Sequence, residues 1–142
     1  MGMDGLENDA SLITGEKQKV LIFIVCFNDE KSIELLLQKI PKEILDGSRF
    51  DTEILIIDNR SSDRTFFAAC DFAAGRSDLK LVILYNPKSR GYGANQKIGF
   101  RYAIDHGFDA IVLLHGDNRY PPQRLPEMAR LTEKTLSDFS VV

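Results

Sequence analysis

The sequence lacks the features of a disulfide-rich, nucleic-acid-binding or membrane-spanning protein. Its two cysteines, Cys26 and Cys70, lie in apolar segments without CxxC spacing, so we expect small buried hydrophobic residues and a reducing, cytoplasmic setting. The net charge of −3 gives no basic field of the kind that nucleic-acid binding needs. The longest apolar run, Val20 to Phe27, is too short to cross a bilayer. If the chain acts at the cytoplasmic face of a membrane, these residues do not anchor it by spanning.

The length of 142 residues fits one domain. Residues 1–19 are rich in Gly, Asp, Glu, Asn and Lys and lack an apolar signal-peptide core, so we expect a flexible N-terminal tail followed by a domain over 20–142. The last residues, 138–142, resemble the opening of a further strand. We therefore expect the chain to stop within a longer domain.

Short apolar runs alternate with segments of helical periodicity. The apolar runs are Val20–Phe27, Glu53–Ile57, Leu79–Tyr85 and Ala110–Leu114. The helical segments are expected to start at Asn28, at Ser61–Asp63 and at Gly93, and to end at Pro41, near Gly75 and at His106. The second of these helices carries Phe66, Phe67, Cys70 and Ala73. Alternating strands and helices predict βαβ units, and therefore an α/β fold of three layers with a mostly parallel sheet.

Polar residues follow each of the apolar runs. They are Asn28-Asp29-Glu30, Asp58-Asn59, Asn86 and His115-Gly116-Asp117. In a parallel α/β sheet, ligands bind beyond the carboxyl ends of the strands. The sequence therefore predicts that these residues converge on one site.

Four segments resemble the motifs of family 2 glycosyltransferases, in the same order and with the same spacing from Val20 to about Leu131. Ile24 to Glu30 resembles "I-P-x-Y-N-E-E", and Ile57 to Thr65 resembles "V-D-D-G-S-x-D-G-T". Asn86 to Gly99 resembles "N-x-G-x-G-x-A…G", and His115 to Pro122 resembles the metal-binding signature "D-A-D-x-Q-x-P-P". The branch with dolichyl-phosphate mannose synthase and bacterial polyprenyl-phosphate glycosyltransferases is the most similar.

This resemblance implies the nucleotide-sugar-binding part of a GT-A fold. Such a domain would transfer a sugar from a UDP- or GDP-linked donor to an acceptor such as a polyprenyl phosphate. In inverting members the general base lies beyond the equivalent of Val142. We therefore expect no catalytic residue in this chain, and no turnover by the chain alone.

The resemblance also implies roles for individual residues. Phe27 would pack on the base, although it could instead be the last core residue of its strand. Asp58 would accept a hydrogen bond from the base, or act only as a turn or capping residue. Asp29 would lie near the nucleoside, or serve only as an acid in the first turn of a helix. Asp117 would hold Mg²⁺ or Mn²⁺, since these ions prefer oxygen ligands, or would be an ordinary turn residue.

Some positions depart from the family pattern. His115 replaces the first acid of the metal signature and could donate to a ribose hydroxyl or ligate a softer divalent ion, and Gly116 lies between it and Asp117. Arg119 replaces a Gln and could contact the diphosphate or point to solvent, and Arg90 could do either as well. Arg60 replaces a Gly, which is tolerable only if that residue does not need a positive φ.

Two other functional classes are compatible with the pattern. A nucleotidyltransferase also binds nucleotides on a similar sheet, but it should carry a Gly-rich basic loop directly after the first strand, where this chain has Phe27 to Glu30. A non-catalytic binding or interaction domain is favoured by His115 and Arg119. We also expect self-association through an uncovered sheet edge.

Overall fold

The structure is a computed structural model that describes residues 17–88 and 91–117. Strands and helices alternate along the chain, as expected from the alternating pattern of the sequence. In chain order the elements are β1 (Gln18–Cys26), α3 (Ile33–Gln38), α4 (Lys42–Leu45), β2 (Phe50–Asp58), α5 (Thr65–Ala74), β3 (Leu81–Tyr85), α6 (Tyr92–Asp105) and β4 (Ala110–His115).

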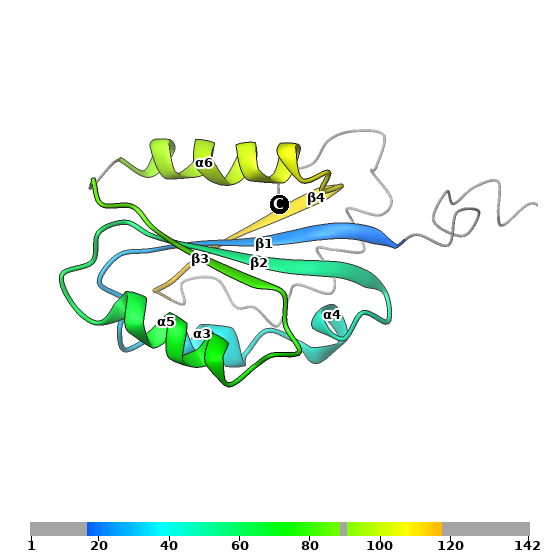
Figure 1. Ribbon diagram of the computed structural model, residues 1–142, viewed down its shortest axis with the longest axis horizontal. Helices are drawn as coiled ribbons and strands as arrows, with labels where there is room; N and C mark the ends of the chain where they lie inside the picture. The colour runs from blue at the N-terminus through cyan, green and yellow to red at the C-terminus, as the bar shows by residue number, and fades with distance from the viewer. Residues whose placement is uncertain (1–16, 89–90, 118–142) are drawn as a thin grey trace, which may run out of the picture.

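The strands form a four-stranded sheet in the order β3-β2-β1-β4, and every pair is parallel. The last paired residues lie side by side: Cys26 is opposite Asp58, Asp58 is opposite Tyr85, and Val25 is opposite His115. Helix α6 covers one face of the sheet, and α3, α4 and α5 lie on the other (Figure 1). The predicted three-layer α/β fold with a parallel sheet is confirmed.

Both faces of the sheet are buried, which explains why the strand sequences are apolar without interruption. Ile22 and Ile24 of β1 pack in the core beneath α3 and α5, whereas Leu21 and Phe23 pack in the core beneath α6. Phe23 lies so close to Gly99 of α6 that a Cβ on Gly99 would be 2.2 Å from the Phe23 ring. The absence of a side chain at Gly99 is what lets α6 approach the sheet here.

The first strand and the first helix differ from the sequence prediction. Strand β1 begins at Gln18, so Gln18 and Lys19, which we expected in the tail, are paired with residues of β2. Helix α3 begins only at Ile33, after Ser32 at the N-cap position. The prediction that Asn28 caps this helix is wrong, because Asn28 has a φ of 52° and belongs to a loop.

Helix α5 does not fully bury Cys70, which the sequence predicts to be a buried residue. Its buried residues are Thr65, Ala69 and Phe72, whereas the side chain of Phe67 is 53% exposed and Cys70 is only half-buried. The helix carries apolar residues around most of its circumference, so sequence periodicity does not fix which side faces the sheet. Cys26 is buried, as predicted.

Within the described ranges, 17–88 and 91–117, no helix has both the length and the apolar character needed to cross a membrane.

Candidate functional site

A hollow of about 220 Å³ opens at the carboxyl edge of the sheet, where the sequence predicts the site. The residues that line it come from the end of β1 and the loop after it, from the loop after β2, from the end of β4 and the residues after it, and from α6. They are Val25, Cys26, Phe27, Asp29, Asn59, Asn95, His115, Gly116 and Asp117. The predicted residues Phe27, Asp29, His115, Gly116 and Asp117 are therefore brought together.

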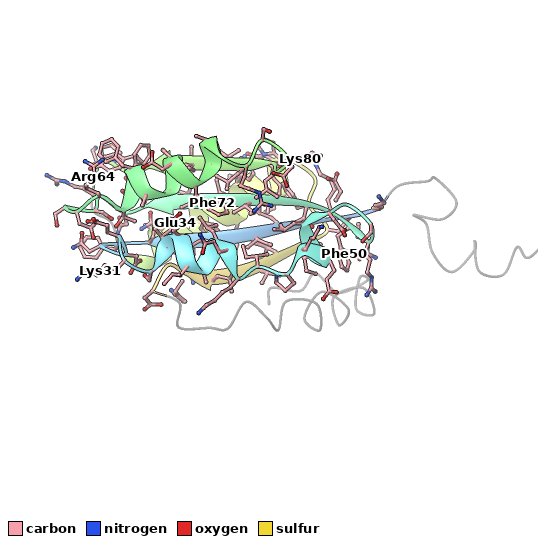
Figure 2. The ribbon with its side chains drawn as sticks, turned by 90° about the horizontal axis from the view of Figure 1, so that it is seen from below. Lys31, Glu34, Phe50, Arg64, Phe72 and Lys80 are labelled. Carbon is pink, nitrogen blue, oxygen red and sulfur yellow. The ribbon has the colours of Figure 1, made fainter. Side chains whose placement is uncertain are left out.

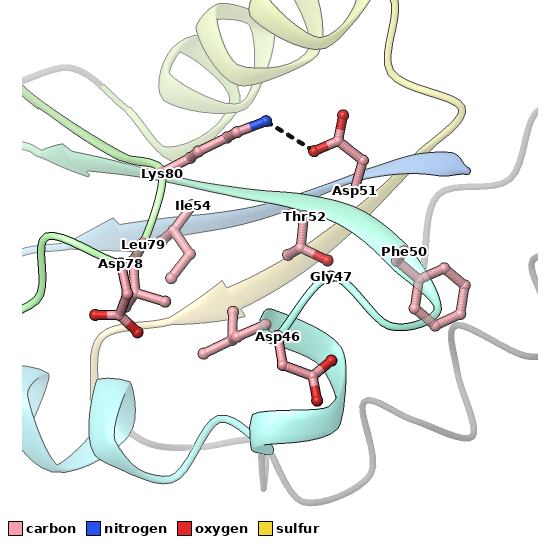
Figure 3. Close-up of a pocket in the computed structure, with 10 residues that line it drawn as sticks. Asp46, Gly47, Phe50, Asp51, Thr52, Ile54, Asp78, Leu79 and Lys80 are labelled. Carbon is pink, nitrogen blue, oxygen red and sulfur yellow. Dashed lines mark hydrogen bonds and ion pairs between the residues drawn. The ribbon is translucent and has the colours of Figure 1, made fainter. Parts of the chain in front are cut away.

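A second cavity, also of about 220 Å³, lies at the opposite end of the sheet, between α4, the start of β2 and the residues before β3 (Figure 3). Lys80 Nζ and Asp51 Oδ1 form an ion pair of 3.0 Å beside it. The residues named by the motifs do not line this cavity, so the carboxyl edge remains the candidate site.

The loops after β1 and β2 are joined by reciprocal hydrogen bonds. The backbone N–H of Asn28 donates to Ser61 Oγ at 2.9 Å, and the backbone N–H of Ser62 donates back to Asn28 Oδ1 at 2.8 Å. The same relationship recurs next to it: the Glu30 N–H donates to Asp63 Oδ2 at 3.3 Å, and the Arg64 N–H donates to Glu30 Oε1 at 3.1 Å. Side-chain oxygens of each loop thus accept hydrogen bonds from backbone N–H groups of the other loop.

The two joined loops each contain a non-glycine residue with left-handed backbone, Asn28 with a φ of 52° and Arg60 with a φ of 54°. Asn tolerates this conformation well, but Arg does not. The sequence suggested that Arg is tolerable at position 60 only if its φ is not positive, but the φ of Arg60 is positive. The hydrogen bonds between the loops impose this backbone conformation on Arg60 despite its cost.

Phe27 lies at the rim of the hollow, and its side chain is 52% exposed. Its backbone N–H donates to Asp29 Oδ2 at 2.9 Å, which fixes the turn in which the ring stands. The alternative that Phe27 is the last core residue of its strand is wrong, because the core ends at Cys26. An exposed ring at the rim is free to stack on a flat ligand.

Gly116 brings the end of β4 against the loop after β1. A Cβ at residue 116 would lie 2.6 Å from Asp29 Oδ2 and 2.6 Å from the Cβ of Cys26, so any side chain would displace one of them. Ser32 Oγ donates to the carbonyl oxygen of Gly116 at 2.7 Å, and the Gly116 N–H donates to the carbonyl oxygen of Val25 at 3.0 Å. The backbone before Asp117 is therefore held on both sides.

Asp29 and Asp117 influence each other electrostatically across the hollow. Burial raises the pKa of Asp29, the negative charge of Asp117 raises it further, and the hydrogen bond from the Phe27 N–H opposes this change. Two carboxylates that line one hollow repel each other, and a bound cation would relieve this repulsion.

The oxygen donors in the hollow are of the kind that a hard divalent cation prefers, if phosphate oxygens complete its coordination. Within the described part of the chain, no group of three or more His, Cys, Asp or Glu side chains could enclose a metal ion. Mg²⁺ at nucleotide sites typically uses only one or two carboxylates, with phosphate oxygens and water completing its coordination. Asp117, which faces the hollow, could supply such a carboxylate, with Asp29 beside it.

Asp58 lies beneath the loop after β2 rather than in the wall of the hollow. It is fully buried, and its Oδ1 accepts a hydrogen bond from Ser61 Oγ. Its Oδ2 is buried without a hydrogen-bond partner among the described residues. Burial raises the pKa of Asp58, and the hydrogen bonds from Ser61 oppose this change. A role in accepting a hydrogen bond from a base stays a prediction.

Asn59, expected at this edge but given no individual role, lies in the wall of the hollow, and so does Asn95, which was not among the predicted site residues. Asn95 is fully buried, and its Oδ1 accepts a hydrogen bond of 3.1 Å from Asn86 Nδ2. The spacing of Asn95, Gly99 and Ala103 along α6 would have revealed its position, because residues four apart share one helix face. Arg90 and Arg119 lie outside the described residues.

Comparisons with known proteins agree with this geometry. The chain is 26% identical over 110 residues to the undecaprenyl-phosphate mannosyltransferase of Micrococcus luteus, an alignment that covers 78% of this chain and 42% of that protein. It is 30% identical over 128 residues to the undecaprenyl-phosphate 4-deoxy-4-formamido-L-arabinose transferase of an Enterobacter species, with 87% of this chain and 36% of that protein covered. The chain thus spans less than half the length of these relatives.

A solved structure has the same fold. A mannosyltransferase from Pyrobaculum calidifontis, in complex with GDP-Man and Mn²⁺, superposes with a TM-score of 0.62 at 21% sequence identity. The superposition covers 76% of this chain and 30% of the other. The sheet and the flanking helices therefore form a GT-A-like fold. Residues 21–142 match the family model described as Glycosyl transferase family 2, and the chain belongs to this family.

Proposed function

We propose that this chain binds a nucleotide diphospho-sugar, UDP- or GDP-linked, together with Mg²⁺ or Mn²⁺, as the donor side of a sugar transfer to a polyprenyl phosphate. The observation that carries the proposal is the hollow at the carboxyl edge, because an exposed aromatic ring and two carboxylates line it together. A sugar nucleotide presents a flat base, a ribose diol and a diphosphate. The ring of Phe27 is suited to stacking on the base, and the carboxylate of Asp117 is suited to binding a cation that accompanies the diphosphate.

The roles of the remaining residues follow from their positions. His115, opposite Val25 at the end of β4, is suited to hydrogen bonding with a ribose hydroxyl. Gly116 and Asp29 would hold Asp117 and Phe27 in place rather than provide most of the binding energy. When bound, the divalent cation would neutralise charge on the diphosphate leaving group. Arg90 and Arg119 stay predictions as further phosphate contacts.

The hydrogen bonds of the loop after β1 argue against a nucleotidyltransferase. A phosphate cradle after the first strand would need unpaired backbone N–H groups. Here the N–H groups of Asn28, Asp29 and Glu30 donate to Ser61 Oγ, Thr65 Oγ1 and Asp63 Oδ2, respectively. Phosphate would have to displace these acceptors, so we place it on the side of Asp117 instead.

The proposed acceptor follows from the relatives, whose names describe transfer to undecaprenyl phosphate. That the general base lies beyond residue 142, and that the chain alone does not turn over, stay predictions from the sequence. Release of nucleoside diphosphate by this chain in the presence of a polyprenyl phosphate, above the uncatalysed rate, would contradict them.

Isothermal titration with GDP-mannose and with UDP-glucose, each in Mn²⁺ and in EDTA, tests the proposed donor. We expect saturable heat with one of the donors in Mn²⁺ and weaker binding in EDTA. A chain that binds neither donor in either buffer would instead be an interaction domain that has kept the fold without the ligand.

A further inference from the structure

Three aromatic side chains form a cluster at the start of α5 and the end of β3, at the same edge of the sheet as the hollow. The ring of Phe66 makes edge-on contacts with Phe67 at 5.9 Å and with Tyr85 at 5.6 Å between ring centroids. Phe67 and Tyr85 are 53% and 45% exposed. These side chains are not needed to fill the core, because α5 packs on the sheet through Thr65, Ala69 and Phe72.

Exposed cations lie next to this cluster. The guanidinium of Arg64 stands 4.9 Å from the centre of the Phe67 ring. Arg60, in the loop after β2, and Lys88, three residues after Tyr85, are also exposed. Figure 2 shows Arg64 and Lys31 extending from the same end of the molecule. We call Arg60, Arg64, Phe66, Phe67 and Tyr85 the aromatic-basic rim.

Two acidic residues near the rim, Glu30 and Asp63, accept hydrogen bonds from backbone N–H groups, whereas Asp71 is exposed one turn after Phe67 on α5. Glu30 Oε1 accepts the backbone N–H of Arg64 at 3.1 Å, and Asp63 Oδ2 accepts the backbone N–H of Glu30. Asp63 Oδ1 accepts the backbone N–H of Thr65 at 2.9 Å. The carboxylates of Glu30 and Asp63 are thus engaged by the joined loops, and Arg60 and Arg64 are exposed although the whole chain carries a net charge of −3.

Aromatic rings with arginines beside them match the chemistry of a bilayer surface. Aromatic side chains settle at the level of the headgroups, and basic side chains gain energy near anionic lipids. The start of α5 and the end of β3, which carry the rim, lie at the carboxyl edge of the sheet (Figure 1), and the hollow lies at the same edge. A membrane that contacts the rim would place its surface next to the donor site.

We propose that the aromatic-basic rim docks this chain on an anionic membrane surface, with Phe67 and Tyr85 at the headgroup level and Arg60 and Arg64 against lipid phosphates. This docking rests on the proposed function in one respect: a polyprenyl phosphate acceptor is embedded in a membrane, and docking beside the hollow brings the donor to it.

Co-sedimentation with vesicles tests the docking. We expect the chain to bind vesicles of phosphatidylcholine and phosphatidylglycerol, and to bind phosphatidylcholine alone far less. The Arg60→Ala and Arg64→Ala changes should each weaken binding about fivefold, and added salt should weaken it further. Phe67→Ser and Tyr85→Ser should also weaken it, by removing the aromatic contribution.

Ile104→Ser is the matched control, because Ile104 is 65% exposed but lies near the end of α6, away from the carboxyl edge. It should bind vesicles as the wild type does. Failure of the wild type to bind anionic vesicles, or equal losses in Ile104→Ser and Phe67→Ser, would overturn the proposal. So would light scattering that shows a dimer lost in Phe67→Ser, because a second copy would then cover the rim. Nucleotide titration of the same variants is a separate readout, and it should not change.

Discussion

Gly116 packs directly against the carboxylate of Asp29, so closely that a Cβ at residue 116 would lie 2.6 Å from Asp29 Oδ2. The two residues are 87 positions apart and belong to the first and last of the four motifs. Ser32 Oγ adds a hydrogen bond to the carbonyl oxygen of Gly116 at 2.7 Å. The loop that holds Phe27 and the strand end that holds Asp117 are thus one packed unit.

The Gly116→Ala change should disturb this unit. The new methyl group would push on Asp29 or Cys26, and overpacking of this kind costs about 1–3 kcal/mol. Urea unfolding should show this loss, and nucleotide affinity should fall with it. Gly91→Ala is the control at the same edge, since its Cβ would meet nothing within 4 Å and its φ is −63°. Equal stability of the two variants would show that Gly116 is not constrained by its contacts.

Gly99 of α6 should be equally intolerant of a side chain, because its Cβ would meet the buried ring of Phe23 at 2.2 Å. We expect Gly99→Ala to destabilise the fold by about 1–3 kcal/mol. Gly93→Ala in the first turn of the same helix has open space around it and should gain up to about 1 kcal/mol from helix propensity. Thermal unfolding of both variants tests the contrast, and a stable Gly99→Ala protein would contradict the close approach of α6.

Arg60→Gly should stabilise the protein. A left-handed residue with a side chain costs roughly 1–2 kcal/mol, and Gly loses about 0.5–1 kcal/mol more entropy on folding, so the net gain should be about 0.5–1 kcal/mol. Arg64→Gly is the matched control: Arg64 is also exposed, but its φ is −95°, so the change should destabilise. A loss of stability in Arg60→Gly would mean that its side chain contributes more than its backbone conformation costs.

Asp58 should make stability depend on pH. Burial raises its pKa in the folded protein, so over the range from about pH 4 up to that raised pKa the folded state binds more protons than the unfolded chain. The stability contributed by this group therefore falls as pH rises through that range. Asp58→Asn removes the titration, so the variant should gain stability relative to the wild type as pH rises. A pH-independent difference between the two would contradict the raised pKa.

The same variant tests the function of Asp58. If its unpartnered Oδ2 accepts a hydrogen bond from the donor base, Asp58→Asn should lose nucleotide affinity about tenfold, the typical effect of losing a hydrogen bond to a charged group. A variant that is more stable and still binds nucleotide normally would limit Asp58 to a structural role.

The strand ends and the convergence of the motifs could be predicted from the sequence, because both follow from local apolar runs and from the geometry of parallel sheets. The conformation of the loop after β1 could not be predicted from the sequence. Asn28 looks like a helix cap, but its side chain bonds to Ser62, a partner 34 residues away. The exposure of the Phe67 ring could not be predicted either, since only packing against the sheet selects which face of an apolar helix is buried.

The sequence predicted that His115, Gly116 and Asp117 lie together with Phe27 and Asp29, and these residues line one hollow; a metal at Asp117 stays a prediction. Asn95 was missed although it lies in the expected helix, because a polar residue in a helical segment gives no sign of being buried against the sheet. Burial of Asp58 could not be predicted either, because the loop that covers it is held by contacts with the loop after β1.

The most direct test of the account is the titration of nucleotide sugar in Mn²⁺ with Asp117→Asn against Asp105→Asn. Asp105 is an exposed acid at the end of α6 that pairs with Arg101 at 3.1 Å, so its change alters the net charge equally without touching the hollow. We predict that Asp117→Asn weakens binding in Mn²⁺ at least about tenfold, or about 1.4 kcal/mol, and that Asp105→Asn leaves it unchanged. Wild-type affinity in Asp117→Asn would contradict the assignment of the donor site to this edge of the sheet.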